Sequence, residues 1–207
     1  MKGKMPITAR ELVAKLQADP EYVARRKAQE QELAERSARL RVEEEPILAD
    51  LRCVGWDVES VWDLVNTSAE YREAIPVLVK HLLLAYSDRT REGIARALAV
   101  PDAKYAWPTL VAEYRKAPVG AGIIAPGDTR EFKLGVKDGL ACALSATATE
   151  ATIEELIALA KDRSHGQSRL LFLKALKRSK NPTANRALEE LVSDPDLAKE
   201  IASWKRY

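Results

Sequence analysis

The sequence predicts an all-α protein, a right-handed α-solenoid in which helical hairpins stack side by side. Two observations predict this fold class. Apolar residues recur with helical spacing along the chain, and no sustained period-2 alternation occurs. Two interleaved series of helices also repeat at an interval of 32 residues, broken by one insertion. A unit of two helices cannot bury its apolar face alone, so neighbouring units must stack.

Composition and charge are those of an ordinary folded protein. Apolar residues make up 46% and charged residues 31%, and the net charge of +2 gives no overall bias toward nucleic acid. No apolar run reaches the roughly 20 residues that cross a membrane. The basic start, Met1 to Met5, is not followed by an apolar stretch, so we expect no secretory signal. Cys53 and Cys142 lie in apolar stretches and are expected to be buried free thiols in a reducing cytoplasm.

Helix starts are marked by capping sequences. Residues 8–11 and 128–131 fit capping boxes, with Thr8 and Asp128 at the cap and a glutamate three positions later. Asp19-Pro20 and Asp194-Pro195 each place an acceptor at the cap and proline at the first helical position. These signals and the periodicity predict helices over 8–18, 20–45, 46–54, 58–66, 70–85, 88–100, 104–116, 129–146, 150–162, 167–180, 183–193 and 195–204.

The internal repeat is carried by two series. Segment 91–98 matches segment 137–144 at a shift of 46, and segment 169–176 follows at a further 32. In the helices between them, Leu78, Leu110, Leu156 and Leu188 are separated by 32, 46 and 32. One insertion within 117–130, rich in proline and glycine, explains both exceptions.

The repeat pattern joins an aliphatic-Pro-x-Leu first helix to a second helix that begins with a basic residue. Asp88 with Arg91, and Asp162 with Arg169, supply a turn acid and a helix arginine. This pattern resembles the short HEAT-like repeats of bacterial proteins, of the phycobilisome-lyase type, over about residues 68–194. The resemblance implies the fold and not one function. Lys137 replaces the arginine in the middle repeat, so an Asp–Arg ladder would be incomplete there.

Three regions follow. Residues 1–57 form an N-terminal helical cap with a long charged helix, residues 58–194 form the repeats with the insertion loop 117–130, and residues 195–207 form a C-terminal capping helix. The charged helix 20–45 and the segment after it carry Leu33, Leu40 and Ile47 at intervals of seven. We expect this helix to lie along the solenoid by a narrow stripe. A partner helix or a dimer seam is the alternative, so the oligomeric state stays open.

The sequence contains no motif of a catalytic, cofactor-binding or metal site. His81 lies within an apolar helix, where we expect a packed or half-exposed imidazole, and His165 lies in a polar turn. Two dispersed histidines and two dispersed cysteines do not make a zinc site. Nucleophile-elbow and phosphate-loop motifs are absent, as are the paired His-Glu dipeptides of HEAT-like metal hydroxylases. We therefore expect no cofactor, no metal and no enzymatic activity.

The register of the repeat predicts which residues face a binding surface, because in HEAT-like solenoids the second helix of each hairpin lines the concave side. Ile94, Ala97 and Leu98 are then core positions. The outward positions run through the three second helices as Arg89, Glu92, Arg96, Asp138, Cys142, Ser145, Gln167, Leu170, Lys174, Lys177 and Arg178. In the insertion, Ile123 and Ile124 either fold back over the edge of the solenoid or contact a partner.

The charge distribution fits a solvated helix face, with a docking patch for a partner as the alternative. Residues 163–181 carry six basic side chains and no acid, whereas residues 46–75 carry six acids and two arginines. The leading hypothesis is a cytoplasmic bacterial scaffold that binds a partner protein through its concave face, as an adaptor or as an immunity protein that neutralises a toxin. No membrane partner is expected.

Nucleic-acid binding is the alternative, as in the alkylpurine DNA glycosylases built from HEAT-like repeats. Those enzymes use a basic concave surface with aromatic residues and a catalytic aspartate. The matching residue types here are Asp138 and the four tryptophans Trp56, Trp62, Trp107 and Trp204. Trp107 falls in the core register of the repeat, which disfavours this alternative.

Overall fold

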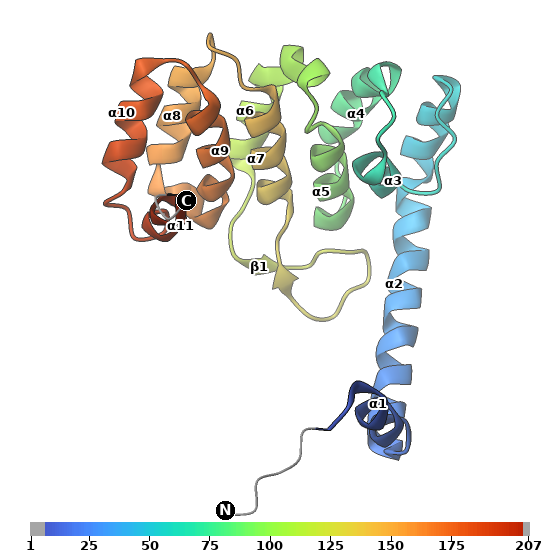
Figure 1. The fold of residues 1–207 in the computed structure, drawn as a ribbon. Coiled ribbons are helices and arrows are strands. Elements are labelled where there is room, and N and C mark those ends of the chain that lie inside the picture. The colour runs from blue at the N-terminus through green and yellow to red at the C-terminus, as the bar shows by residue number, and fades with distance from the viewer. Residues whose placement is uncertain (1–6, 205–207) are drawn as a thin grey trace, which may run out of the picture.

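The computed structural model describes residues 7–204, and most of this part is helical (Figure 1). The prediction of a mainly helical protein is confirmed. Its α-helices are α1 (Ala9–Gln17), α2 (Pro20–Cys53), α3 (Val61–Asn66), α4 (Ile75–Leu82), α5 (Asp88–Ala97), α6 (Trp107–Lys116), α7 (Val136–Thr147), α8 (Ile153–Lys161), α9 (Leu173–Arg178), α10 (Pro182–Leu191) and α11 (Ala198–Ser203). Three 3-10 segments, η1 (Arg72–Ala74), η2 (Pro101–Ala106) and η3 (Arg163–Phe172), complete the helical structure of the described residues. None of the helices in residues 7–204 is long and apolar enough to cross a membrane.

Beyond α2, the helices form two adjacent rows (Figure 1). The first row contains α4, α6, α8 and α10. The second row contains α3, α5, α7 and the pair η3–α9, each packed against the one before it. Across the rows, α4 packs on α5, α6 on α7, α8 on η3 and α10 on α9. Of the four leucines at the predicted repeat position, Leu78, Leu110 and Leu156 are fully buried between the rows, and Leu188 is half-buried.

Two glycines allow close packing along the second row. A Cβ atom added at Gly139 of α7 would lie 2.9 Å from the carbonyl oxygen of Glu92 in α5. A Cβ atom added at Gly93 of α5 would lie 2.8 Å from Trp62 Nε1 in α3. Each glycine therefore faces the preceding helix of the row. The short helix α3 occupies the place of the row's first member.

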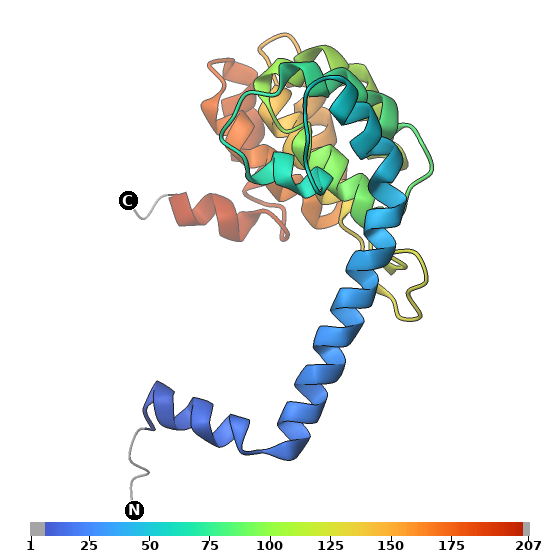
Figure 2. The ribbon, with the colours of Figure 1, turned by 90° about the vertical axis from the view of Figure 1, so that its right-hand side faces the viewer.

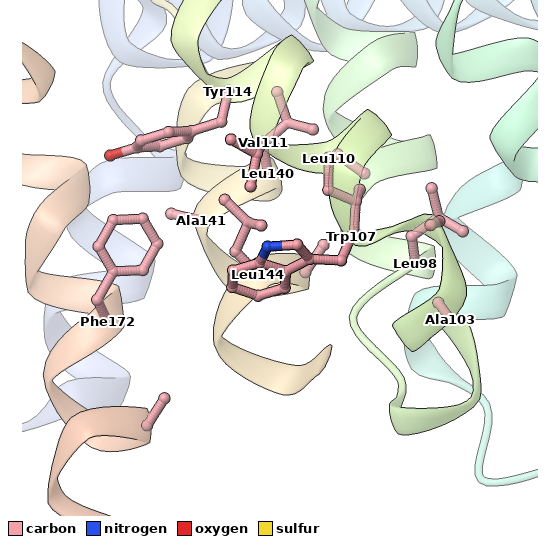
Figure 3. Packing of buried hydrophobic residues seen from close by; sticks show 14 of the residues in the cluster. Leu98, Ala103, Trp107, Leu110, Val111, Tyr114, Leu140, Ala141, Leu144 and Phe172 are labelled. Carbon is pink, nitrogen blue, oxygen red and sulfur yellow. The ribbon is translucent and has the colours of Figure 1, made fainter. Parts of the chain in front are cut away.

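The core between the rows is continuous (Figure 3). Trp107 and Leu110 of α6 pack with Leu140 and Leu144 of α7, and Phe172 at the end of η3 lies on the other side of α7. The predicted core positions Ile94, Ala97 and Leu98 are confirmed, since all three are fully buried. The prediction for Cys53 was wrong: its side chain is exposed in the last turn of α2, where Leu51 takes the buried position.

The long helix α2 runs without a break through Pro46, so the predicted break at residue 46 was wrong. The burial of Ile47, Leu48 and Leu51 against the rows holds the helix together beyond the proline. The first half of α2 and all of α1 project away from the rows (Figure 2). The caps at Thr8 and Asp19 are confirmed by hydrogen bonds to Glu11 N and to Glu21 N.

Two other predicted helix starts were wrong. Residues 129–135 form no helix but contain the strand β2 (Phe132–Lys133), which pairs antiparallel with β1 (Ala121–Gly122). The carboxylate of Asp128 is bound by arginines of α2 and does not cap a helix. Asp194 likewise binds Arg169, and residues 195–197 form a turn before α11. The expectations for residues 1–6 and 205–207 lie outside the described residues.

Candidate functional site

A hollow of about 380 Å³ crosses the second row. It is called the second-row hollow below. Five of the eleven predicted outward residues line it: Cys142 and Ser145 of α7, Leu170 of η3, and Lys174 and Arg178 of α9. The other lining residues are Ala99, Ala146 and Leu171. The floor is thus mainly apolar. The two basic side chains of the lining, Lys174 and Arg178, are both exposed and come from α9.

Next to the hollow, α5 carries a charged cluster built on Glu92. Its Oε2 accepts a hydrogen bond from Arg89 Nη1 at 2.9 Å, and its Oε1 accepts one from Arg96 Nε at 2.8 Å. Glu92 itself is only 8% exposed. The Arg89 guanidinium lies 3.7 Å from the ring centre of Trp62. Glu92 therefore orients two surface arginines and offers little surface of its own.

Arg96 connects this cluster with the hollow. Its Nη1 lies 3.7 Å from Cys142 Sγ. Burial raises the pKa of the Cys142 thiol, although the neighbouring Arg96 charge lowers it. The thiol is therefore neutral near pH 7, because a free cysteine already has a pKa of about 8.5. Cys142 thus forms part of the floor and is not an activated nucleophile.

The basic end of the chain separates into structural and surface residues. Arg169 is completely buried, and its Nη1 donates to Asp194 Oδ2 at 2.8 Å, so it holds the last units together. Arg163 also binds Asp194, at 3.2 Å. Lys177 Nζ lies 4.5 Å above the ring of Trp204, and Arg178 Nη2 donates to the Ser145 carbonyl oxygen at 3.2 Å. The surface basic group of this unit thus includes Lys174, Lys177 and Arg178, of which Lys174 and Arg178 line the hollow.

The insertion is held against α2 by Asp128. Arg36 Nε and Arg39 Nη2 donate to its Oδ1 at 2.9 and 3.2 Å, and the carboxyl side chain is 2% exposed. The backbone of Ile124 is also fixed, because its carbonyl oxygen accepts a hydrogen bond from Arg89 N at 2.8 Å. Ile124 is half-buried, whereas Ile123 is 50% exposed. The two isoleucines therefore differ: Ile124 folds back onto the body and Ile123 faces outward.

Asp138 lies apart from the second-row hollow. It is in the first turn of α7, and its Oδ2 accepts a hydrogen bond from Lys133 Nζ of strand β2 at 2.9 Å. The structure therefore brings Asp138 to the base of the insertion and not to the floor of the second-row hollow. Sequence reasoning missed this, because the register places α7 correctly but says nothing about where the inserted strand returns.

The histidines do not form a metal site. His81 is buried as expected, with Nε2 2.9 Å from Asp50 Oδ2 and Nδ1 2.8 Å from the Tyr86 hydroxyl. His165 was expected as a polar turn residue but is buried against Tyr114, with ring centres 4.6 Å apart. Within residues 7–204, no group of three or more His, Cys, Asp or Glu side chains is arranged to hold a metal ion.

The aromatic side chains serve mainly in packing. Trp107 is buried and donates from Nε1 to Glu155 Oε2 at 2.8 Å. Trp56 packs edge-on against Tyr71 at 5.8 Å between ring centres. Trp62 and Trp204 are covered by Arg89 and Lys177.

Comparisons with known proteins identify no relative from which a role could be transferred. No protein-family model matches the chain, and neither a curated protein nor a solved structure matches it.

Proposed function

We propose that the chain is a right-handed α-solenoid of HEAT-like hairpins and acts as a non-catalytic scaffold in the bacterial cytoplasm. It binds a partner protein through the second-row hollow and through the insertion 117–130. The observation that carries this proposal is the hollow itself, where side chains from three successive second-row segments converge on an apolar floor with a basic edge.

Equivalent contacts support the repeat. Lys137 Nζ of α7 donates to the carbonyl oxygen of Tyr114 at 3.0 Å, and Arg169 Nη1 of η3 donates to that of Ala160 at 3.2 Å. Both acceptors lie four residues after the repeat leucine of their own first-row helix, Leu110 or Leu156. A basic residue of the second helix thus satisfies a free carbonyl at the C-terminus of the first helix. Arg91 departs from this rule and pairs with Glu113 at 2.8 Å.

The chemistry of the hollow suits a protein segment. Apolar contact area at the centre with charged groups at the edge is the usual arrangement of protein interfaces. Lys174 and Arg178 favour an acidic segment, and the exposed Ile123 of the insertion adds a separate apolar contact. An adaptor and a toxin-neutralising immunity protein both fit this surface, and they differ in the partner.

Nucleic-acid binding is the second candidate, favoured by the cluster of Lys174, Lys177 and Arg178. It requires the phosphate backbone to contact these cations, so its affinity must fall steeply with salt. The burial of Trp107 and the ion pair of Asp138 with Lys133 leave these two residues poorly placed for a flipped base.

Site-specific crosslinking tests the proposal. A photo-crosslinking amino acid is placed at Lys174, or at Arg186 on α10 as a control, and the full-length chain is illuminated in its native cells. If the chain binds a partner protein, position 174 should give one dominant protein adduct and position 186 should give none. Nuclease treatment should leave the adduct from position 174 unchanged. The combined change Lys174→Glu, Lys177→Glu and Arg178→Glu should remove the partner in a parallel pull-down while the circular dichroism spectrum stays unchanged. Adducts to nucleic acid alone, released by nuclease, would overturn protein binding in favour of the second candidate.

A further inference from the structure

A second cavity, of about 230 Å³, lies where the base of the insertion meets η3. Pro118, Val119 and Leu134 form its apolar wall, and Lys137, His165 and Gln167 are among its polar lining residues. None of its lining residues belongs to the second-row hollow. The cavity is called the insertion cavity below. It is separate from the second-row hollow, although Pro118, Val119 and Gly120 of its lining belong to the insertion.

Lys137 supplies a buried positive charge at this cavity. The residue is 5% exposed, and its Nζ donates to two neutral acceptors, the carbonyl oxygens of Tyr114 at 3.0 Å and Ala117 at 2.7 Å. Among the described residues, no carboxylate lies within ion-pair distance of this amine. An ammonium group has three N–H donors, so one remains for a further acceptor. The centre of the Tyr114 ring lies 4.8 Å from Nζ, and the Asp162 carboxylate favours the charge of Lys137 without forming an ion pair with it. Because a buried charge without a paired counter-charge is costly, an anion in the cavity would be stabilised.

His165 is the second buried polar group of the cavity. Its side chain is 7% exposed, and the Asp162 carboxylate lies 3.5 Å from Nε2. Its ring nitrogens make no hydrogen bond to any residue in the described part of the chain, and neither of them is a fully enclosed atom, so both reach the accessible surface. Burial, together with the charge of Lys137, lowers its pKa, while Asp162 opposes this and Arg115 and Arg169 add to it. The imidazole is therefore neutral near pH 7 and can donate one hydrogen bond to a ligand.

The remaining charges of the cavity cancel each other. Lys133 Nζ lies 2.9 Å from Asp138 Oδ2, so these two side chains form their own ion pair. The positive charge of Lys137 is left to determine what the cavity accepts. Its volume is below the roughly 300–1,000 Å³ of sites for drug-sized ligands, which limits a ligand to about the size of one amino-acid residue.

We propose that the insertion cavity binds a carboxylate carried on a short apolar body. The carboxylate oxygens accept hydrogen bonds from Lys137 and His165, and the apolar body packs on Val119 and Leu134. A free small carboxylic acid and the C-terminal residue of another protein chain share this chemistry.

The direct test titrates the isotope-labelled full-length chain with N-acetyl-leucine and with its neutral analogue N-acetyl-leucinamide, followed by NMR. The acid should bind with a dissociation constant on the order of 1 mM and shift signals of the lining residues. Its negative charge should also raise the pKa of His165, read from the imidazole signals. The amide should bind at least about tenfold more weakly, because it lacks the charge. Equal binding of acid and amide, or no shift at about 20 mM acid, would overturn the proposal.

Two exposed valines provide a matched pair of variants. Val119→Glu places a negative charge at the cavity, where the side chain is 55% exposed, and Val192→Glu places one at the end of α10, where it is 39% exposed. Val119→Glu should weaken N-acetyl-leucine binding at least about fivefold through charge repulsion, and Val192→Glu should not change it. If both variants bind like the wild type, the acid binds elsewhere and the assignment fails.

A third probe, a five-residue peptide ending in leucine, distinguishes the two sources of the carboxylate by its affinity. Tighter binding than N-acetyl-leucine identifies a protein C-terminus, and weaker binding identifies a free small acid. The triple glutamate variant of Lys174, Lys177 and Arg178 leaves the insertion cavity unchanged, so it should bind N-acetyl-leucine like the wild type. Failure of the scaffold proposal and failure of this one are therefore separable.

Discussion

Asp88 caps a helix that begins 48 residues later: its Oδ1 accepts a hydrogen bond from Val136 N, the first residue of α7, at 3.2 Å. Its Oδ2 accepts a second one from Gly135 N at 2.7 Å. Glu43 of α2 caps α5 in the same way, because its Oε1 accepts a hydrogen bond from Ser87 N at 2.7 Å. The N-termini of successive second-row helices are thus satisfied by the element before them, which fixes how far each helix is shifted along its neighbour.

Replacing Asp88 tests the strength of this cap. Asp88→Ala removes both acceptors, and we expect a loss of about 1–2 kcal/mol in the free energy of unfolding, the usual cost of a lost helix cap. Urea unfolding measures this. Asp138→Ala, which removes an exposed ion pair from the same helix, is the control and should cost less than about 1 kcal/mol. Equal losses would mean that the cap adds nothing.

The two glycines of the second row should respond differently to alanine. In Gly139→Ala the new methyl group meets the backbone oxygen of Glu92, which cannot move without shifting α5. In Gly93→Ala it meets the Trp62 side chain, which can rotate. We expect losses of about 2–3 kcal/mol for Gly139→Ala and about 1 kcal/mol or less for Gly93→Ala. Thermal unfolding should show the larger decrease in Tm for Gly139→Ala, and the reverse order would contradict the packing.

The positions of the row helices were predictable from local sequence, whereas the path of the insertion was not. Leu78, Leu110 and Leu156 are buried as their spacing predicts, because the register of stacked helices depends on a period that the chain itself displays. Asp128 reads locally as a helix cap, but its carboxylate binds Arg36 and Arg39 of α2. No local pattern identifies a partner about 90 residues earlier in the chain. The candidate site divides in the same way: five of the eleven residues that the register places outward line the hollow, and the position of Asp138 depended on the insertion.

The Asp128 contacts should control the order of the insertion. The double change Arg36→Met and Arg39→Met leaves the buried Asp128 carboxylate without its partners, which is unfavourable by a few kcal/mol for a charge of this burial. We expect faster cleavage within residues 117–130 in limited proteolysis, with sites identified by mass spectrometry. Arg26→Met removes an exposed ion pair with Glu30 on the same helix and should leave the cleavage rate unchanged. Protection of the insertion in the double variant would show that other contacts hold it.

Arg169 should make the stability of the fold depend on pH. Its hydrogen bond holds the pKa of Asp194 below the ordinary value, although burial opposes this. A carboxyl group with a depressed folded-state pKa contributes stability above its unfolded pKa of about 3.9, and this contribution disappears as the pH falls through the folded pKa. Urea unfolding of the wild type should therefore show a loss of stability between about pH 5 and pH 2. In Arg169→Met this part of the pH dependence should shrink, and an unchanged profile would assign it to other carboxylates.

The two thiols provide a test of the second-row hollow that needs no mutation. Cys53 is exposed, whereas Cys142 lies in the floor of the hollow and has a pKa raised by burial. Because the thiolate is the reactive form, iodoacetamide should alkylate Cys53 first and Cys142 at least about tenfold more slowly at pH 8. A partner protein that occupies the hollow should slow the reaction of Cys142 further and leave Cys53 unaffected, which makes Cys53 an internal control. Peptide mass spectrometry over time measures both rates. Equal slowing of both thiols would indicate binding elsewhere or a general change in structure, and it would remove the hollow as the interface.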